Sequence, residues 1–160
     1  MGLKARDVMQ TGVITVQPDA SLLDVYRLFV EDEINGAPVV DENARVVGVI
    51  TSSDLLRSVE EERDTAAAES TYFSESFSFG GVDWVVSPAD FQERLAEHTV
   101  ADAMTAGAIA VDIDDEIPVV ASALHKHRIH RVLVCDQGEL VGVITTFDLV
   151  RLLIDSDVAR

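Results

Sequence analysis

The chain lacks the features of a disulfide-stabilised or membrane-inserted protein. Its 160 residues include one cysteine, Cys135, so a disulfide within the chain is excluded. No apolar run approaches the roughly 20 residues of a membrane helix, and the first residues contain no apolar core of signal-peptide length. We therefore expect a soluble, cytoplasmic protein without a membrane contact.

Positive charge is scarce as well. The chain has 12 Lys and Arg residues against 29 Asp and Glu residues, which gives a net charge of −17. Such a surface argues against general binding to nucleic acid, which needs clustered positive charge. Only Lys4 and Lys126 are lysines. An acidic, lysine-poor surface is typical of a salt-rich, halophilic cytoplasm, where salt screens repulsion between like charges. An ordinary acidic protein is the alternative.

What the sequence does contain is an internal repeat. Asp102 follows Asp7 by 95 positions, and short matching segments surround both residues. Asp148 follows Asp54 by 94 positions, so the second copy is one residue shorter. The strongest match joins the segments GVITSSD, which ends at Asp54, and GVITTFD, which ends at Asp148.

Each copy predicts the element order β-α-β-β-α, which places the chain in the α/β (α+β) class. The first copy predicts strands over 13–16, 37–40 and 46–50, with Pro38 near the start of the second. Ser21 is expected to cap a helix whose apolar residues follow helical spacing, namely Leu22, Val25, Tyr26, Phe29 and Val30. A last helix follows the Thr-x-x-Asp segment, and Pro118 falls in the first turn of a second-copy helix.

The repeated Thr-x-x-Asp segment has two interpretations. Thr51 and Thr145 lie where a strand gives way to a helix, and a helix N-terminus favours anions such as phosphate. Asp54 and Asp148 could accept hydrogen bonds from the two hydroxyls of a ribose. The same spacing is that of a capping box, in which Thr and Asp only complete the helix start. Because a repeated fold repeats its caps, the sequence leaves both interpretations open.

These features together resemble a tandem pair of CBS domains, also called a Bateman module, of an archaeal or halophilic type. The resemblance covers residues 3–59 and 99–155 and rests on the Asp-x-Met openings, the Pro-Val-Val-Asp strand and the repeated Gly-x-Ile-Thr-x-x-Asp signature. It implies two pseudo-symmetric repeats whose clefts hold AMP, ADP, ATP or S-adenosylmethionine. Asp54 and Asp148 would hold ribose and Thr51 and Thr145 phosphate. Thr15, Ala37 and Pro38 complete the ligand-binding residues that we expect.

A basic cluster interrupts the acidic sequence over 125–131. Its first residues are explained by the preference of cations for a helix C-terminus, but His130 and Arg131 should already lie at the following strand. The pair resembles the His-Arg pair of the nucleotide-sensing subunit of AMP-activated protein kinase. That resemblance implies that His130 and Arg131 contact the phosphate of the ligand held by Asp54. Asn35-Gly36 stands at the equivalent place in the first copy. The spacing of His125 and His127 disfavours a metal site.

The stretch between the copies is unusually aromatic for a linker. We divide the chain into a first repeat (1–59), an insert (60–98) and a second repeat (99–160). The insert contains six of the nine aromatic residues and a strong helix start at Ser87-Pro88. It either covers the surface of the module or forms a docking site for a partner.

We expect a regulatory module that binds an adenosyl ligand, forms a homodimer and acts on an unknown effector protein. The homodimer, of disc shape, is implied by the resemblance. An interaction scaffold without a small-molecule ligand, docking an effector through its insert, is the alternative. No nucleophile elbow, catalytic carboxylate pair or metal-ligand spacing appears in the sequence, so we expect neither an enzyme nor a catalytic cofactor.

Overall fold

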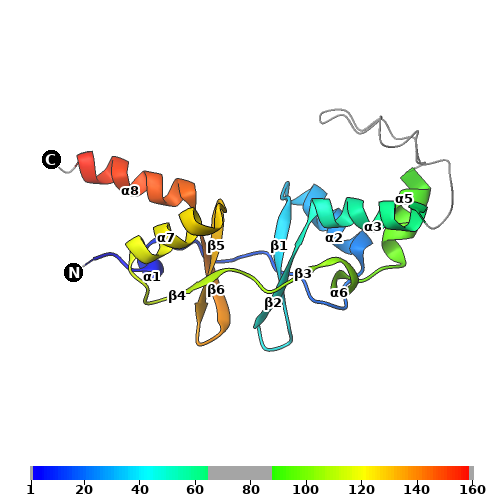
Figure 1. Ribbon diagram of the computed structural model, residues 1–160, viewed down its shortest axis with the longest axis horizontal. Helices are drawn as coiled ribbons and strands as arrows, with labels where there is room; N and C mark the ends of the chain where they lie inside the picture. Colours follow the sequence, from blue (N-terminus) through cyan, green and yellow to red (C-terminus); the bar gives the residue numbers. More distant parts are fainter. Residues whose placement is uncertain (1, 65–87, 159–160) are drawn as a thin grey trace. The chain divides into compact units, whose positions relative to one another are not determined.

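The chain forms two three-stranded sheets, ordered β1-β2-β3 and β4-β5-β6, with helices packed against them, and this confirms the α/β class. The computed structural model describes residues 2–64 and 88–158 (Figure 1). The elements of its first part are α1 (Ala5–Val8), α2 (Leu22–Glu31), β1 (Gly36–Val40), β2 (Val46–Thr51) and α3 (Ser52–Asp64). Those of its second part are α5 (Pro88–Ala96), α6 (Val100–Ala103), β3 (Thr105–Ala106), β4 (Ala110–Asp112), α7 (Ile117–His127), β5 (Arg131–Asp136), β6 (Glu139–Thr145) and α8 (Thr146–Val158).

Helix starts follow the capping residues expected from the sequence. The Ser21 hydroxyl accepts a hydrogen bond from the Asp24 N–H at 3.1 Å, so Ser21 caps α2 as predicted. Leu22, Val25 and Phe29 of α2 are buried, which confirms most of its predicted apolar face. Val30 is the exception, because 59% of its surface stays exposed.

The predicted strand over 13–16 is wrong. Only Val16 pairs, through an isolated parallel bridge to Val39, whereas the equivalent second-copy segment forms β4. In the second copy, Leu133 N–H donates to Ile109 O and Ile113 N–H donates to Cys135 O. Pro38 and Pro18 stand 95 positions before these two donors. Because proline has no N–H, both bonds that would extend the bridge are missing from the first copy.

The chain divides into two compact units whose members do not follow the chain in order. Unit 1 contains residues 1–15, 40–48 and 106–160, and unit 2 contains residues 16–39 and 49–105. Helix α1 therefore belongs with the second-repeat elements and α6 with the first-repeat elements. In unit 1, Ala5 N–H donates to Asp115 O at 2.8 Å; in unit 2, Val100 N–H donates to Ala20 O at 2.9 Å. Both residues of each pair differ by 95 positions from their counterparts, so the repeats exchange their first helices.

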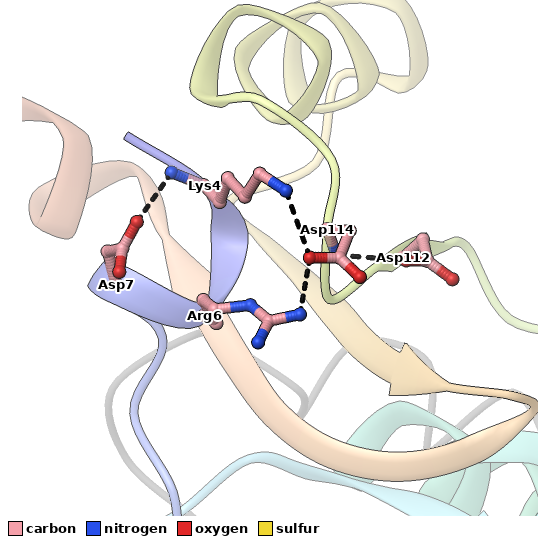
Figure 2. A network of polar contacts seen from close by, with 5 residues as sticks. All are labelled: Lys4, Arg6, Asp7, Asp112 and Asp114. Carbon is pink, nitrogen blue, oxygen red and sulfur yellow. Dashed lines mark hydrogen bonds and ion pairs between the residues drawn. The ribbon is translucent and has the colours of Figure 1, made fainter. Parts of the chain in front are cut away.

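Charged side chains hold α1 within unit 1 (Figure 2). Lys4 Nζ lies 3.1 Å from Asp114 Oδ1, and the Arg6 guanidinium bonds to the same oxygen. The hydrogen bond from Lys4 and the charges of Lys4 and Arg6 lower the pKa of Asp114 below its ordinary value. The Asp114 N–H donates in turn to Asp112 Oδ1 at 2.9 Å, which shapes the turn between β4 and α7. All three charged side chains are exposed, so these ion pairs add little to the free energy of folding. Their main effect is to orient α1 within unit 1.

Gly142 is required where the chain after α1 lies against β6. A Cβ atom at this position would stand 2.6 Å from Met9 Sδ and 2.9 Å from Gln10 O. We expect Gly142→Ala to lower the free energy of unfolding by about 1–3 kcal/mol, the usual cost of overpacking a tight contact. Urea unfolding followed by circular dichroism measures the change. Gly2→Ala is the control, because its nearest neighbour would be Glu116 Cδ at 4.0 Å. Equal stability of both variants would contradict the close contact.

The described part of the insert packs on unit 2. Helix α5 begins at Pro88 as predicted and contacts both α2 and α3, next to which it lies in Figure 1. Phe91 and Leu95 are buried, and the Phe91 ring meets Tyr26 edge-on with centroids 5.4 Å apart. This helix covers the protein's own surface, which was one of the two expectations for the insert. The other five aromatic residues of the insert lie outside the described residues.

Candidate functional site

The first Thr-x-x-Asp segment forms the turn between β2 and α3. The Thr51 N–H donates to Asp54 Oδ2 at 2.8 Å, and the Thr51 hydroxyl donates to the same oxygen at 3.0 Å. The Asp54 N–H points back to the Thr51 hydroxyl oxygen at 3.4 Å. The helix starts at Ser52, so Asp54 lies within its first turn and not before it. This is the reciprocal arrangement of a capping box.

The second segment repeats this geometry between β6 and α8. The Thr145 N–H and hydroxyl donate to Asp148 Oδ2 at 2.8 and 3.0 Å, and the Asp148 N–H lies 3.3 Å from the Thr145 hydroxyl oxygen. The cap interpretation of the sequence is therefore realised in both copies. In each copy the cap uses Oδ2, and it fixes the direction in which Oδ1 points.

The Oδ1 atoms have different partners in the two copies. Asp54 is 5% exposed, and its Oδ1 lies 3.3 Å from the Arg57 guanidinium, a long contact. Asp148 is half-buried, and its Oδ1 accepts a 2.8 Å hydrogen bond from Gln10 Nε2. Both partners are side chains, which a ligand hydroxyl can displace. Each carboxylate thus has one oxygen committed to the helix start and one that can turn to a ligand.

Asp148 carries the charge that hydroxyl binding needs. Partial burial alone would raise the pKa of Asp148, but the hydrogen bonds from Thr145 and Gln10, with the nearby charge of Arg151, together lower that pKa below its ordinary value. The carboxylate is therefore ionised at neutral pH and acts only as an acceptor. A lowered pKa also means that this group stabilises the fold above its unfolded-state pKa, and that the contribution is lost as the pH falls through the folded-state value.

A third turn of the same kind occurs at the start of α6. The Thr99 N–H and hydroxyl each donate to Asp102 Oδ2 at 3.0 Å. Here the turn follows α5 and begins a helix of four residues, and Asp102 is exposed. The Thr-x-x-Asp geometry by itself therefore marks a helix start; the strand before the turn and the burial of the carboxylate distinguish Asp54.

The remaining residues predicted for the first-copy site divide between strand and loop. Ala37 and Pro38 lie in β1, which is the neighbour of β2 in the sheet, and both are buried. The Pro38 carbonyl accepts the Val16 N–H at 3.1 Å. These two residues can contribute shape but no free polar side chain. Thr15 is exposed and has no regular secondary structure.

Arg131 is the first residue of β5, as predicted, whereas His130 lies in a bend just before the strand. Arg131 pairs with Thr145 across the β5–β6 ladder, and the His130 carbonyl accepts the Thr146 N–H at 2.9 Å. His130 also borders a hollow of about 500 Å³, whose lining residues are Leu124, His125, Lys126, Arg128, Ile129 and His130. Four of these six carry basic side chains. Unit 1 therefore gathers basic groups near the Thr145–Asp148 turn, within a chain of net charge −17.

Two partners of the signature carboxylates were not identified from the sequence. The first partner is Arg57, which follows Asp54 by three residues. Because Arg151 follows Asp148 at the same spacing, the repeat itself could have indicated an arginine beside each signature carboxylate. Arg151 pairs instead with Asp155 at 3.8 Å. The second partner, Gln10, could not be predicted from local sequence. An antiparallel bridge to Val143, far along the chain, brings Gln10 to the Thr145–Asp148 turn.

Residues 2–64 and 88–158 contain no group of three or more His, Cys, Asp or Glu side chains placed to hold a metal ion. None of the helices in these ranges has the length and apolar character needed to cross a bilayer.

Comparison with known proteins decides the family. The model of the CBS domain matches residues 5–61 and again residues 100–155, which together make up most of the chain. The chain belongs to the CBS-domain family. It is 30% identical over 156 residues to the uncharacterized protein MJ1426 of Methanocaldococcus jannaschii, covering 93% of this chain and 90% of that protein. It spans less than two thirds of other curated relatives, 42% of one and 57% of another.

Solved CBS-domain structures share this fold. The structure of CBSX2 from Arabidopsis thaliana in complex with AMP has a TM-score of 0.69 at 24% identity, covering 98% of this chain and 99% of that one. The CBS domain pair of MJ0100, in complex with 5′-methylthioadenosine and S-adenosyl-L-methionine, has a TM-score of 0.65 at 22% identity, covering 98% and 99%. These likenesses confirm that the chain has the fold of a CBS-domain pair. The matching family model is not that of a catalytic family.

Proposed function

We propose that this protein is a regulatory CBS-domain pair that binds an adenosyl ligand, either AMP, ADP or ATP or S-adenosylmethionine. The observation that carries the proposal is the repeated turn, in which the helix cap aligns one oxygen of Asp54 and of Asp148 and leaves the other to displaceable side chains. An ionised carboxylate that accepts both hydroxyls of a ribose suits this arrangement. The CBS-domain structures with AMP and with S-adenosyl-L-methionine support the ligand class.

The helix N-termini supply the second part of the proposed site. Helices α3 and α8 start directly after Thr51 and Thr145, and both have 13 residues in the structure. The start of such a helix favours an anion, and the Thr hydroxyl can donate to a phosphate oxygen. We assign Thr51, Asp54, Thr145 and Asp148 to direct ligand contact, with Thr15, Ala37 and Pro38 around the first turn. His130 and Arg131 then supply positive charge for phosphate.

The proposed mechanism is a change of conformation or assembly on ligand binding. A ligand shifts an equilibrium only as far as it binds one state better than the other. The change in conformation or assembly is transmitted to a separate effector protein. The ligand is not chemically altered and dissociates unchanged. Chromatography of the nucleotide after incubation with the protein is expected to recover it intact.

An interaction scaffold without a ligand is the second candidate. The observation in its favour is that the capping boxes are complete without any ligand, and that the Thr99–Asp102 turn forms the same contacts. A scaffold would use these turns for helix starts alone. The two candidates differ in whether purified protein responds to adenosyl compounds.

Thermal melting tests the proposal. At least one of AMP, ADP, ATP and S-adenosylmethionine is expected to raise the melting temperature, because a ligand at a hundredfold excess over its dissociation constant adds about 2.7 kcal/mol to the native state. The double variant Asp54→Ala with Asp148→Ala is the control and should lose the shift while remaining folded. No shift with any of the four compounds, in salt that keeps the protein folded, would favour the scaffold.

A further inference from the structure

The carboxylate of Asp148 is engaged on both of its oxygens by groups of this chain. Thr145 donates to Oδ2, and Oδ1 accepts a 2.8 Å hydrogen bond from the side-chain amide of Gln10, which is 138 positions away in the sequence. Oδ1 is also the atom that the proposed ligand would use for a ribose hydroxyl. The Gln10 amide and a ribose hydroxyl are both donors, so they compete for this acceptor.

Gln10 is held in place by its backbone, whereas its side chain is exposed. The Gln10 N–H donates to Val143 O at 2.9 Å, and the Val143 N–H donates back to Gln10 O at 3.0 Å. Gly142 lies directly against the same segment, because an added Cβ atom would stand 2.9 Å from Gln10 O. The backbone therefore stays fixed, while an exposed side chain rotates rapidly between rotamers. The Gln10 amide can leave Asp148 and return without local unfolding.

The first repeat has no such donor at its signature carboxylate. Thr105 stands 95 positions after Gln10 and lies in β3, next to β2 in the sheet. A threonine side chain is much shorter than a glutamine side chain, and within the described residues Thr105 makes no hydrogen bond to Asp54. Oδ1 of Asp54 instead has the long 3.3 Å contact with Arg57, whose side chain is 60% exposed. Exposed ion pairs are weak, so a ligand displaces little at this turn.

We propose that Gln10 is an internal competitor for ribose at the Asp148 turn, so that this turn binds an adenosyl ligand only after the Gln10 amide has left Oδ1. This inference rests on the proposed function, because it concerns a ligand at the same carboxylates. The apparent affinity falls in proportion to the fraction of the protein in which the oxygen is free. The Asp148 turn therefore responds at a higher ligand concentration than it would without Gln10. Thr105 imposes no such competition at the Asp54 turn.

Calorimetry with AMP and with adenosine in the Asp54→Ala background tests the proposal at the Asp148 turn alone. Gln10→Thr places the residue of one repeat in the other and removes the competing amide. We expect both compounds to bind about tenfold more tightly, the effect of removing a contact that is formed about nine-tenths of the time. The factor should be the same for both compounds, because they carry the same ribose.

Two further variants show whether the hydrogen bond is responsible. Gln10→Met keeps the length of the side chain but has no donor, so it should strengthen binding as Gln10→Thr does. Gln17→Thr is the matched control, because Gln17 is also an exposed glutamine but belongs to unit 2. It should leave both affinities unchanged, and circular dichroism checks that each variant is folded. Tighter binding by Gln10→Thr but not by Gln10→Met would overturn the proposal, since the side chain would then act through its bulk.

The remaining outcomes separate this inference from the proposed function. If neither AMP nor adenosine binds to the natural chain or to Gln10→Thr, both the proposed function and the inference are wrong. If AMP binds to the natural chain, the inference alone is wrong in two cases. In the first, Gln10→Thr leaves the affinity of the Asp148 turn unchanged or lowers it. In the second, the Asp148 turn binds neither compound with glutamine or with threonine at position 10.

Discussion

Replacing Asp54 by alanine is expected to weaken the binding of an adenine nucleotide by tenfold or more while the protein stays folded. Each hydrogen bond from a ribose hydroxyl to an ionised carboxylate contributes roughly 1.5–3 kcal/mol. Asp54 is also nearly buried, so a ligand hydroxyl would meet its oxygen with little competition from water. Isothermal titration calorimetry with AMP measures the change. Asp54→Asn keeps an oxygen for the helix cap but loses the charge, so its affinity should fall while its stability falls less.

Asp102→Ala separates the loss of a ligand contact from the loss of a cap. The Thr99–Asp102 turn has the same donors and nearly the same distances as the Thr51–Asp54 turn, but it lies at the start of a short helix. Losing a cap costs about 1 kcal/mol of stability. We expect Asp102→Ala to show that loss with unchanged affinity. If Asp54→Ala behaves in the same way, both carboxylates serve only as caps.

Local sequence signals predicted most of the fold correctly. Ser21 capped its helix, Pro118 fell in a first helical turn, and both Thr-x-x-Asp segments formed strand-to-helix turns. These features depend on residues within four positions of one another, so a single sequence contains the information. The wrong strand over 13–16 was also local in origin. The missing donors at Pro18 and Pro38 are visible in the sequence, but their importance depends on which strands pair.

Contacts between distant segments could not be predicted in this way. The exchange of α1 and α6 between the repeats depends on which surface each short helix covers, and a four-residue helix has too few apolar residues to specify it. Gln10 reaches Asp148 only because an antiparallel bridge to Val143 brings it there. The exposed apolar side chains of Phe147, Leu153 and Ile154 in α8 are a similar case, because they look like ordinary core positions until the structure shows that they remain exposed.

The phosphate group is the part of the proposed ligand whose binding this chain is expected to favour least. The net charge of −17 creates a field that opposes an anion, so local cations must compensate for it. Arg131 suits this role because a guanidinium can donate two parallel hydrogen bonds to phosphate oxygens. The first copy has Gly36 in the equivalent position, so it has no counterpart of Arg131. The two turns are therefore expected to differ in their preference for phosphorylated ligands.

Arg131→Ala is expected to weaken the binding of AMP about tenfold or more. The affinity for adenosine should stay nearly unchanged, because only AMP carries the phosphate. Lys126→Ala is the control, since Lys126 belongs to the same basic hollow but not to the predicted pair. The resemblance assigns Arg131 to the ligand of Asp54, whereas its place across the ladder from Thr145 makes the Asp148 turn the alternative. Calorimetry in two backgrounds decides between them. The effect of Arg131→Ala should disappear in the Asp54→Ala background and persist in the Asp148→Ala background; the reverse result would move Arg131 to the Asp148 turn.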